Sequence, residues 1–460
     1  MSRFVDKAQL RALSRLAFPI VIIQVGLMFM GVVDTIMVGH VSAAGLGAVA
    51  LGNLYFFAAA IFGMGVLLAL DPVISQAVGA HDDDAIARAV QRGFVLSLGL
   101  TVVASLMLPT AGPVLRWLRQ PDDVVPLART YVLATIPGVA PFFFFVVVRQ
   151  ALQAMHRTRP IVITIVLANL VNVFVNWILI FGNLGAPALG VFGAAIATSI
   201  SRWSMFFMIV LFSWPLIRPY VDPWRSEAFA LRPLGRMVQI GAPIGVAYFL
   251  EYANFGGIAL LMGLLGTYEV AGHQIAINLA SLTFMVPAGV GAAATVLVGN
   301  AIGRNDPAAA RSSAKAALVA GGGFMLMSAA VFLLFPEVLA GLYTDDPKVL
   351  AIAFALIPIA GLFQVFDGLQ VVGAGVLRGV GDTRAPMIIG LLGFWLLGMP
   401  VSVYLGLNTP LRAAGLWWGF VIGLAAVAGF LLLRIRHRFS RELHRLEVEE
   451  RHLPAFDIAD

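Results

Sequence analysis

Long apolar stretches recur along almost the whole of this 460-residue chain, and each is as long as a lipid bilayer is thick. The hydrocarbon core of a bilayer requires about 20 apolar residues in helical form, so each stretch predicts one membrane-spanning helix. The charged residues, only 12% of the total, fall in short clusters between these stretches and predict loops. The sequence therefore predicts an all-α membrane protein with twelve transmembrane helices, at residues 16–39, 46–79, 89–111, 131–151, 160–182, 190–214, 235–266, 272–300, 314–335, 349–378, 384–407 and 411–433.

Composition excludes several other classes of protein. The chain has no cysteine, so neither a disulfide framework nor a thiolate metal site is possible. A net charge of +6 could suggest nucleic-acid binding, but an unequal distribution of charge across a membrane explains it more simply. Residues 1–15 are basic and lack a small-residue cleavage site, so we expect a retained cytoplasmic leader.

The basic residues fix an expected orientation. If both ends of the chain are cytoplasmic, 23 of the 30 lysines and arginines lie in inner segments and only 5 in outer segments. Cytoplasmic loops of membrane proteins carry such an excess of basic residues. We therefore expect a multi-pass protein of a bacterial inner membrane with both termini in the cytoplasm.

The two halves of the chain resemble each other. A shift of 224 residues aligns Gln76–Gly79 with Asn300–Gly303, and a shift of 225 aligns Thr158–Arg159 with Thr383–Arg384. Each repeat holds six helices, an even number, so the copies share one orientation and are related by a pseudo-twofold axis along the membrane normal. The predicted units are an N-lobe, a cytoplasmic linker, a C-lobe and a cytoplasmic tail, at residues 1–214, 215–234, 235–433 and 434–460.

Four acids fall inside the predicted spans: Asp34, Asp71, Glu251 and Asp367. A charge near the bilayer centre costs about 2.5 to 3.5 kcal/mol on insertion scales, so such residues usually face a cavity or a partner. An acid in a cavity that is alternately hydrated and closed can bind and release H+ or Na+. The alternative is a polar residue satisfied by packing between helices. Asp71 lies near the inner end of its span, where water or a lipid head group could reach it.

The repeat does not duplicate these acids. Asp34 aligns with Ile258, Glu251 with Leu27, and Asp367 with Phe142. We therefore expect each lobe to have its own specialised site.

Further polar and aromatic residues are candidates for the same sites. Arg202 needs an anion within its span, and we hypothesise Asp34 or Asp71 as its partner. Pairs of amides at i, i+4 spacing could bond an acid or an ion, although interhelical packing is an equal alternative. Three aromatic rings could stack on a cation, although packing is the commoner role. These amides and aromatic residues are Asn172, Asn176, Gln274, Asn278, Tyr248, Phe284 and Phe366.

Several segments resemble the multidrug and toxic compound extrusion (MATE) family. The resemblance is close over residues 270–293, and it extends to Val33–Gly39, Asn172–Asn176 and Gln364–Asp367 leading into Val376–Gly379. Since these segments lie in both halves, the resemblance covers most of the chain. The presence of Asp34, Glu251 and Asp367 together is similar to the NorM-like bacterial branch.

The resemblance implies a V-shaped pair of six-helix bundles that exports organic cations and other amphipathic drugs by antiport with Na+ or H+. It implies that Glu251 and Asp367 form the C-lobe cation site, and hold Na+ if sodium is the coupling ion. It further implies that Asp34 and the asparagines form an N-lobe proton or drug site. The chain departs from the family at Asp71 and Arg202, where relatives carry apolar or uncharged residues.

Other functions fit less well. A lipid-linked precursor flippase of the same superfamily would share the paired bundles, but usually has additional helices and a basic cavity. An intramembrane enzyme is disfavoured because the chain has no HExxH or GxSxG motif and no histidine cluster within a span. We expect a monomer in contact with membrane lipid, with small-molecule drugs as substrates and no cofactor besides the coupling ion.

Overall fold

The computed structural model describes residues 7–448, which are helical apart from short connections. Twelve helical spans within this range are long and apolar enough to cross a membrane, as the sequence predicts. Most run beyond the predicted windows. The first begins at Lys7 and the seventh at Leu231, because polar residues at helix ends can continue a helix outside the apolar stretch.

The first six spans contain several breaks. The second span is divided between α2 and α3 at Leu68–Ala69, just before the acid Asp71. Proline at the start of η1 and η2 accompanies similar breaks in the third and fourth spans. The elements are α1 (Lys7–Gly39), α2 (Ala43–Leu67), α3 (Leu70–Gly79), α4 (Asp83–Met107), η1 (Leu108–Thr110), α5 (Ala111–Trp117), α6 (Val124–Thr135), η2 (Ile136–Gly138), α7 (Val139–Ala154), α8 (Arg159–Phe181), η3 (Asn183–Gly185) and α9 (Gly190–Val221).

The last six spans follow after a short connection. Because α9 continues to Val221 and α10 begins at Leu231, helices take in much of the segment 215–234 predicted as a linker. The elements are η4 (Ser226–Phe229), α10 (Leu231–Leu265), α11 (Thr267–Gly303), α12 (Pro307–Leu334), α13 (Pro336–Gly341), α14 (Pro347–Gly379), α15 (Arg384–Gly390), η5 (Leu391–Gly398), α16 (Met399–Leu407) and α17 (Arg412–Phe439).

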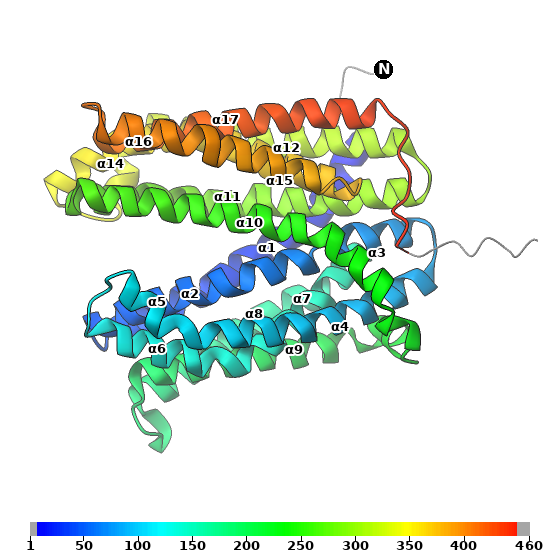
Figure 1. The fold of residues 1–460 in the computed structure, drawn as a ribbon, viewed down its shortest axis with the longest axis horizontal. Helices are drawn as coiled ribbons and strands as arrows, with labels where there is room; N and C mark the ends of the chain where they lie inside the picture. Colours follow the sequence, from blue (N-terminus) through cyan, green and yellow to red (C-terminus); the bar gives the residue numbers. More distant parts are fainter. Residues whose placement is uncertain (1–6, 449–460) are drawn as a thin grey trace, which may run out of the picture.

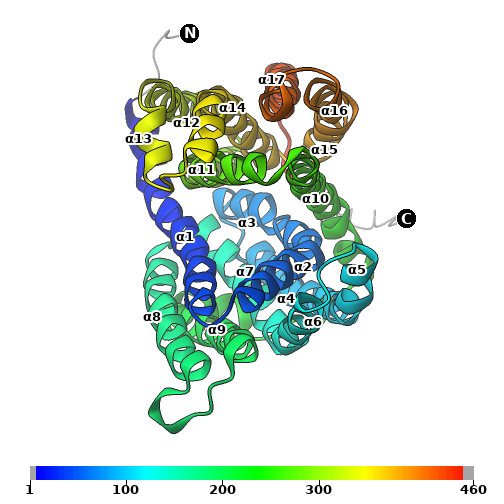
Figure 2. The ribbon, with the colours of Figure 1, turned by 90° about the vertical axis from the view of Figure 1, so that its left-hand side faces the viewer.

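The helices form two groups, which we call the N-lobe (α1–α9) and the C-lobe (α10–α17). In Figure 1 the lobes converge toward the end where α17 finishes and diverge toward the end that carries α5 and α16. We call the first of these the terminal end. Figure 2 views the molecule from the diverging end, with α11 and α10 of the C-lobe facing α1, α2 and α3 of the N-lobe.

Helix α1 contacts both lobes. Leu13, Leu16 and Ile20 belong to the same buried cluster as the core of the C-lobe. Further along the helix, Ile23 and Met30 belong to a cluster formed with α7, α8 and α9. The start of α1 therefore packs on the C-lobe and its remainder packs in the N-lobe.

The repeated sequence Gln76–Gly79 meets its own copy, Asn300–Gly303, where α3 crosses α11. A Cβ atom added to Gly79 would lie 2.1 Å from the carbonyl oxygen of Asn300, and one added to Gly303 would lie 2.0 Å from that of Gln76. Such reciprocal contacts are the signature of a twofold relation between two similar surfaces. Both glycines are needed here because the two backbones touch.

Replacing Gly303 with alanine is therefore expected to destabilise the closed arrangement of the lobes. The new methyl group would displace backbone rather than a flexible side chain, and such overpacking typically costs about 1 to 3 kcal/mol. We expect a lower unfolding temperature in detergent. The matched control is Gly323→Ala, an exposed helix position where a Cβ meets nothing within 4 Å. Equal unfolding temperatures for both variants would contradict the close crossing.

The segment after α17 spans both lobes at the terminal end. Leu443 packs against the C-lobe cluster, whereas Leu446 packs against an N-lobe cluster. The backbone N–H of Leu446 also donates to Gln76 Oε1 at 2.7 Å, and Arg445 pairs with Asp82 at 2.9 Å. Partial burial opposes ionisation of Asp82, but its bonds from the Ala85 N–H and the Arg445 guanidinium prevail and lower its pKa. The tail thus joins the lobes by backbone, charge and apolar contacts.

Candidate functional site

Glu251 and Asp367 line one cavity in the C-lobe. Glu251 comes from α10 and Asp367 from α14, and the cavity between them measures about 280 Å³. Asp367 is buried, and its Oδ1 atom has no hydrogen-bond partner within the described part of the chain. The remaining lining residues come from α10, α11 and α14, and they are Phe255, Ile277, Ala280, Ser281, Phe284, Met285 and Phe363.

A second, narrower cavity of about 60 Å³ also contains Glu251 in its wall. It is bordered by Tyr248, Gln370 and Arg378, and it reaches Asp382 beyond the end of α14. Phe284 belongs to the walls of both cavities. Glu251 therefore lies between the wider cavity and a narrow passage directed toward the terminal end.

The two C-lobe acids act on each other electrostatically. Two ionised carboxylates in one low-dielectric cavity repel, so binding a cation or a proton there is favourable. Carboxylate oxygens are suitable ligands for hard cations such as Na+, and an aromatic wall suits an organic cation. The cavity can therefore accept either an inorganic or an organic cation, and a single set of charges would serve both.

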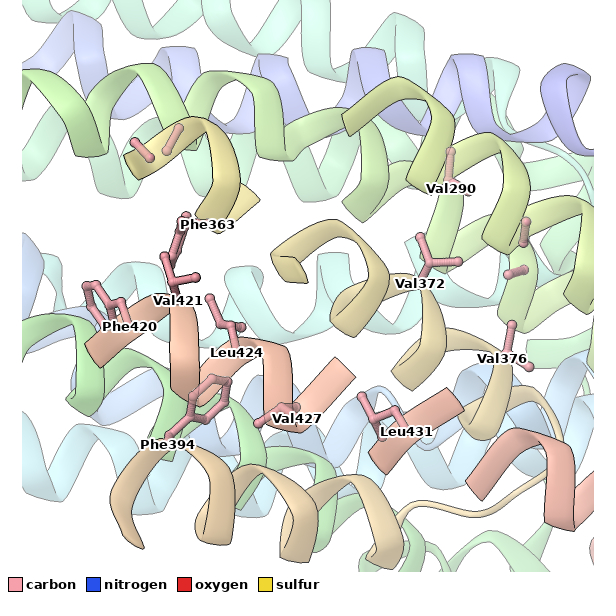
Figure 3. Close-up of a cluster of buried hydrophobic side chains, with 14 of the residues drawn as sticks. Val290, Phe363, Val372, Val376, Phe394, Phe420, Val421, Leu424, Val427 and Leu431 are labelled. Atoms are coloured by element: carbon pink, nitrogen blue, oxygen red, sulfur yellow. The ribbon is translucent and has the colours of Figure 1, made fainter. Parts of the chain in front are cut away.

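The aromatic candidates divide between cavity wall and packing. Tyr248 and Phe284 line the cavities, whereas Phe366 packs against the hydrophobic cluster of the C-lobe. Figure 3 shows part of that cluster, with Phe363 beside Val421 and Phe420 of α17. The rings of Phe363 and Phe420 lie 5.5 Å apart. This packing holds α14, and with it Asp367, against α17.

Gln274 and Asn278 bond to each other on α11. The Gln274 amide nitrogen donates to Asn278 Oδ1 at 3.1 Å, and the Gln274 side chain is exposed. Neither residue belongs to the walls of the two cavities, although Ile277 and Ser281 on the same helix do. The structure thus places this amide pair beside the C-lobe site and not in it.

Asp34 occupies a separate site within the N-lobe. Its Oδ1 atom accepts hydrogen bonds from Asn172 at 3.0 Å and Asn176 at 2.5 Å, and its Oδ2 atom accepts one from Thr198 at 2.9 Å. The carboxylate is 2% exposed, and α1, α8 and α9 supply these groups. The amide oxygens of both asparagines have no hydrogen-bond partner among residues 7–448. Acceptor oxygens without donors, next to a carboxylate, are suited to a proton or a small cation.

Arg202 lies near this site without an ion pair to it. The hypothesis that Arg202 pairs with Asp34 or Asp71 is not supported, because no pair within 4 Å joins it to either acid in the described structure. Its guanidinium instead lies over the ring of Phe56, 3.8 Å from the ring centre. A cation–π contact of this kind partly replaces a missing anion. Its charge still acts on Asp34 at longer range.

Asp71 finds its partners elsewhere. Its Oδ1 atom accepts a hydrogen bond from Gln150 at 2.7 Å, and its Oδ2 atom lies 3.8 Å from Arg378 of the other lobe. Sequence reasoning missed Gln150, Arg378 and Thr198 as members of these sites. Thr198 lies four residues before Arg202 on α9, and residues at this spacing share one face of a helix. This spacing is the sequence feature that could have indicated Thr198 as a member of the site.

Known proteins resemble the chain over nearly its whole length. The MatE family profile matches residues 19–178 and 243–404. A protein of Cronobacter sakazakii named multidrug resistance protein MdtK is 38% identical, over 94% of this chain and 96% of its own length. Its namesake in Edwardsiella ictaluri is also 38% identical, with 93% and 95% covered.

Solved structures show the same fold. The eukaryotic MATE transporter AtDTX14 superposes with a TM-score of 0.87 at 24% identity, covering 93% of this chain and 96% of that one. The Vibrio cholerae MATE transporter VcmN, in its bent form, gives a TM-score of 0.83 at 20% identity, with 94% and 97% covered. With a family match in both lobes, relatives at 38% identity and this shared architecture, the chain belongs to the MatE family of multidrug and toxic compound extrusion transporters.

Proposed function

We propose that the protein exports organic cations and other amphipathic drugs across a bacterial inner membrane in exchange for Na+ or H+. The observation that carries this proposal is the pair of acids, Glu251 and Asp367, in the wall of one C-lobe cavity. The names of the bacterial relatives, which refer to multidrug resistance, support the substrate class. An acidic cavity and twelve spans also favour this function over a lipid-linked precursor flippase.

In the proposed transport cycle, the drug and the coupling ion compete for the carboxylates of Glu251 and Asp367. We place the terminal end in the cytoplasm, because most lysines and arginines lie there. With the lobes crossing at that end, the C-lobe cavity would be reached from outside. A coupling ion that enters from outside neutralises the carboxylates and weakens drug binding, so the drug leaves outward. The lobes then rock to the opposite arrangement, and the ion is released inside.

In this cycle each residue has a definite task. Glu251 and Asp367 alternately hold the ion and the drug, and Tyr248 and Phe284 supply aromatic surface for the drug. Asp34, with Asn172 and Asn176, forms a second proton or drug site in the N-lobe. No organic cofactor or enzymatic step is involved, and a monomer contains every group required.

Transport driven by separate ion gradients tests this function. Purified protein is reconstituted in liposomes loaded with ethidium, and a sodium gradient or a proton gradient is imposed in turn. We expect drug movement that depends on one of these gradients and collapses with the matching ionophore. Drug retention under both gradients, equal to that of protein-free liposomes, would refute antiport.

The N-lobe site yields a further prediction. Thr198→Val removes one of the three hydrogen bonds to Asp34, and a hydrogen bond to a charged group contributes about 1.5 to 3 kcal/mol. We expect ethidium efflux from cells to fall several-fold. Thr164→Val is the matched control, because the buried hydroxyl of Thr164 has no hydrogen-bond partner in the described structure. Equal efflux by both variants would remove Thr198 from the site.

A further inference from the structure

We propose that Asp71 and Arg378 form a latch that holds the two lobes together at the cytoplasmic end, and that Arg378 connects this latch to the ion site at Glu251. The inference rests on the proposed antiport function. It assigns a role to Asp71, which the transport cycle above does not use.

The first observation is a buried ion pair between the lobes. Asp71 stands in the first turn of α3 in the N-lobe, and Arg378 stands in the last turn of α14 in the C-lobe. Asp71 Oδ2 and Arg378 Nη1 are 3.8 Å apart, with side chains only 1% and 10% exposed. Burying two charges is costly, and apolar residues would often stabilise a static contact better. A pair that forms and separates during a cycle is a more fitting use of such residues.

The pair lies beside the closest crossing of the lobes. Ser75, one turn after Asp71, would be 2.1 Å from a Cβ atom placed on Gly299 of α11. Gln76 donates to the carbonyl oxygen of Gly379, the residue after Arg378, at 2.9 Å. Any movement that separates α3 from α11 and α14 must therefore break the ion pair too.

Asp71 has a second set of partners that belong to its own lobe. Gln150 of α7 donates to Asp71, and Arg149 of the same helix acts on it by its charge. Arg149 in turn donates to Gln150 Oε1 at 3.2 Å. When the lobes part, Asp71 keeps a cation and a hydrogen-bond donor, so the opened N-lobe is not left with an isolated buried charge.

Arg378 has no such substitute in the described structure, where Asp71 is its only carboxylate within 4 Å. It donates to the hydroxyl of Tyr248 at 3.1 Å, and both residues line the narrow cavity that contains Glu251. Asp382 also borders this cavity, but it is held by Arg434 at 2.7 Å. Arg378, released from Asp71, would keep its bond to Tyr248 beside the cavity of Glu251. A nearby cation favours the ionised carboxylate, so Glu251 would give up its proton or Na+ toward the cytoplasm.

The charged and titratable groups that face this step come from five elements. They are Asp71 of α3, Arg149 of α7, Tyr248 and Glu251 of α10, Asp367 and Arg378 of α14, and Asp382 with its partner Arg434 of α17. Among them, Arg378 forms the ion pair with the other lobe and also lines the cavity of Glu251. Arg378 is therefore a positioning residue for ion release.

Distance measurements between spin labels test the latch directly. The chain has no cysteine, so Arg159→Cys and Arg384→Cys place one label at the cytoplasmic end of each lobe. Both positions are exposed and correspond in the internal repeat. In purified protein without drug, we expect Asp71→Asn to shift at least half of the distance distribution to longer values. Arg378→Gln and the double variant are expected to give the same shift, because either change removes the same pair.

The controls separate the latch from general damage. Asp71→Glu keeps the charge and is expected to restore the short distance, a rescue that a purely steric role would not give. Asp222→Asn removes an exposed ion pair with Arg218, four residues earlier in the chain, and should leave the distance between the spin labels unchanged. Unchanged distances in both Asp71→Asn and Arg378→Gln would overturn the proposal. Because no transport is measured, a protein that shows the shift but exports no drug would refute the antiport function and leave the latch standing.

The link to Glu251 has its own readout. In liposomes, Arg378→Gln should slow ion-coupled efflux most at low internal pH, where release of a proton from Glu251 needs the greatest help. Asp71→Asn, which frees Arg378, should not produce this dependence on internal pH. The same pH profile for both variants would overturn the connection between Arg378 and Glu251.

Discussion

Glu251→Gln and Asp367→Asn are each expected to reduce drug efflux to the level of cells that lack the protein. Both acids line the same cavity, and each substitution keeps the shape of the side chain while removing its charge. A neutral amide can neither attract an organic cation nor take up and release a proton. The measurement is ethidium efflux, together with the lowest drug concentration that stops growth, in a bacterial strain without other efflux pumps.

The control for these variants is Glu227→Gln. Glu227 is largely exposed near the start of the C-lobe, where its side chain pairs weakly with Arg88 at 3.9 Å. We expect efflux like that of the unchanged protein. Wild-type efflux by both Glu251→Gln and Asp367→Asn, at equal amounts in the membrane, would exclude the C-lobe cavity as the site of coupling.

The second large effect is expected from Asp34→Asn. Three donors point at this carboxylate, and an asparagine would present an N–H group to some of them. Loss of a charge-assisted hydrogen bond costs about 1.5 to 3 kcal/mol, so efflux should fall on the order of tenfold. The assay is the same ethidium efflux. Asp345→Asn, at an exposed position, is the control, and equal rates for the two variants would count against an N-lobe site.

Much of the fold could be predicted from the sequence because bilayer length and hydropathy restrict the choice so strongly. Twelve windows predicted twelve spans. The repeat at Gln76 and Asn300 indicated two similar halves, but only the structure shows that the two copies meet where the lobes cross. The family resemblance indicated the shared fold. Helix ends were less predictable, since continuation beyond the bilayer depends on contacts that hydropathy does not record. The break before Asp71 was missed for the same reason, because the second span is apolar on both sides of it.

The i, i+4 spacing of amides indicated part of the N-lobe site, but the same spacing at Gln274 and Asn278 marks a pair outside the two C-lobe cavities. Asn172 and Asn176, spaced by four residues, both reach Asp34. The partners of Asp71 were not predictable, because Arg378 lies about 300 residues away and comes close only when the lobes meet. Arg202 acts on Asp34 by its charge without an ion pair in the described structure, and its contact with the ring of Phe56 had no signal in the sequence. A charged side chain inside a membrane needs a partner, but the sequence does not show which helix supplies that partner.

The two lobes are therefore similar in fold but differ in their candidate binding sites. The lobes share six-helix repeats and a reciprocal glycine crossing, yet the C-lobe site has two acids that line one cavity. The N-lobe site at Asp34 has one acid that accepts hydrogen bonds from three donors. This difference suits a division of work, in which the C-lobe exchanges ion for drug. In the N-lobe site, Asp34 already accepts hydrogen bonds from Asn172, Asn176 and Thr198, and a proton or drug that binds there would act on these bonds.

Competition between drug and coupling ion on the purified protein tests the central claim most directly. Binding of ethidium is followed by fluorescence polarisation in detergent while either Na+ concentration or pH is varied. The account predicts that raising Na+, or lowering pH, weakens ethidium binding to the unchanged protein. It also predicts that the Glu251→Gln, Asp367→Asn double variant loses this dependence. Ethidium binding that is insensitive to both ions, or equally sensitive in the double variant, would contradict it.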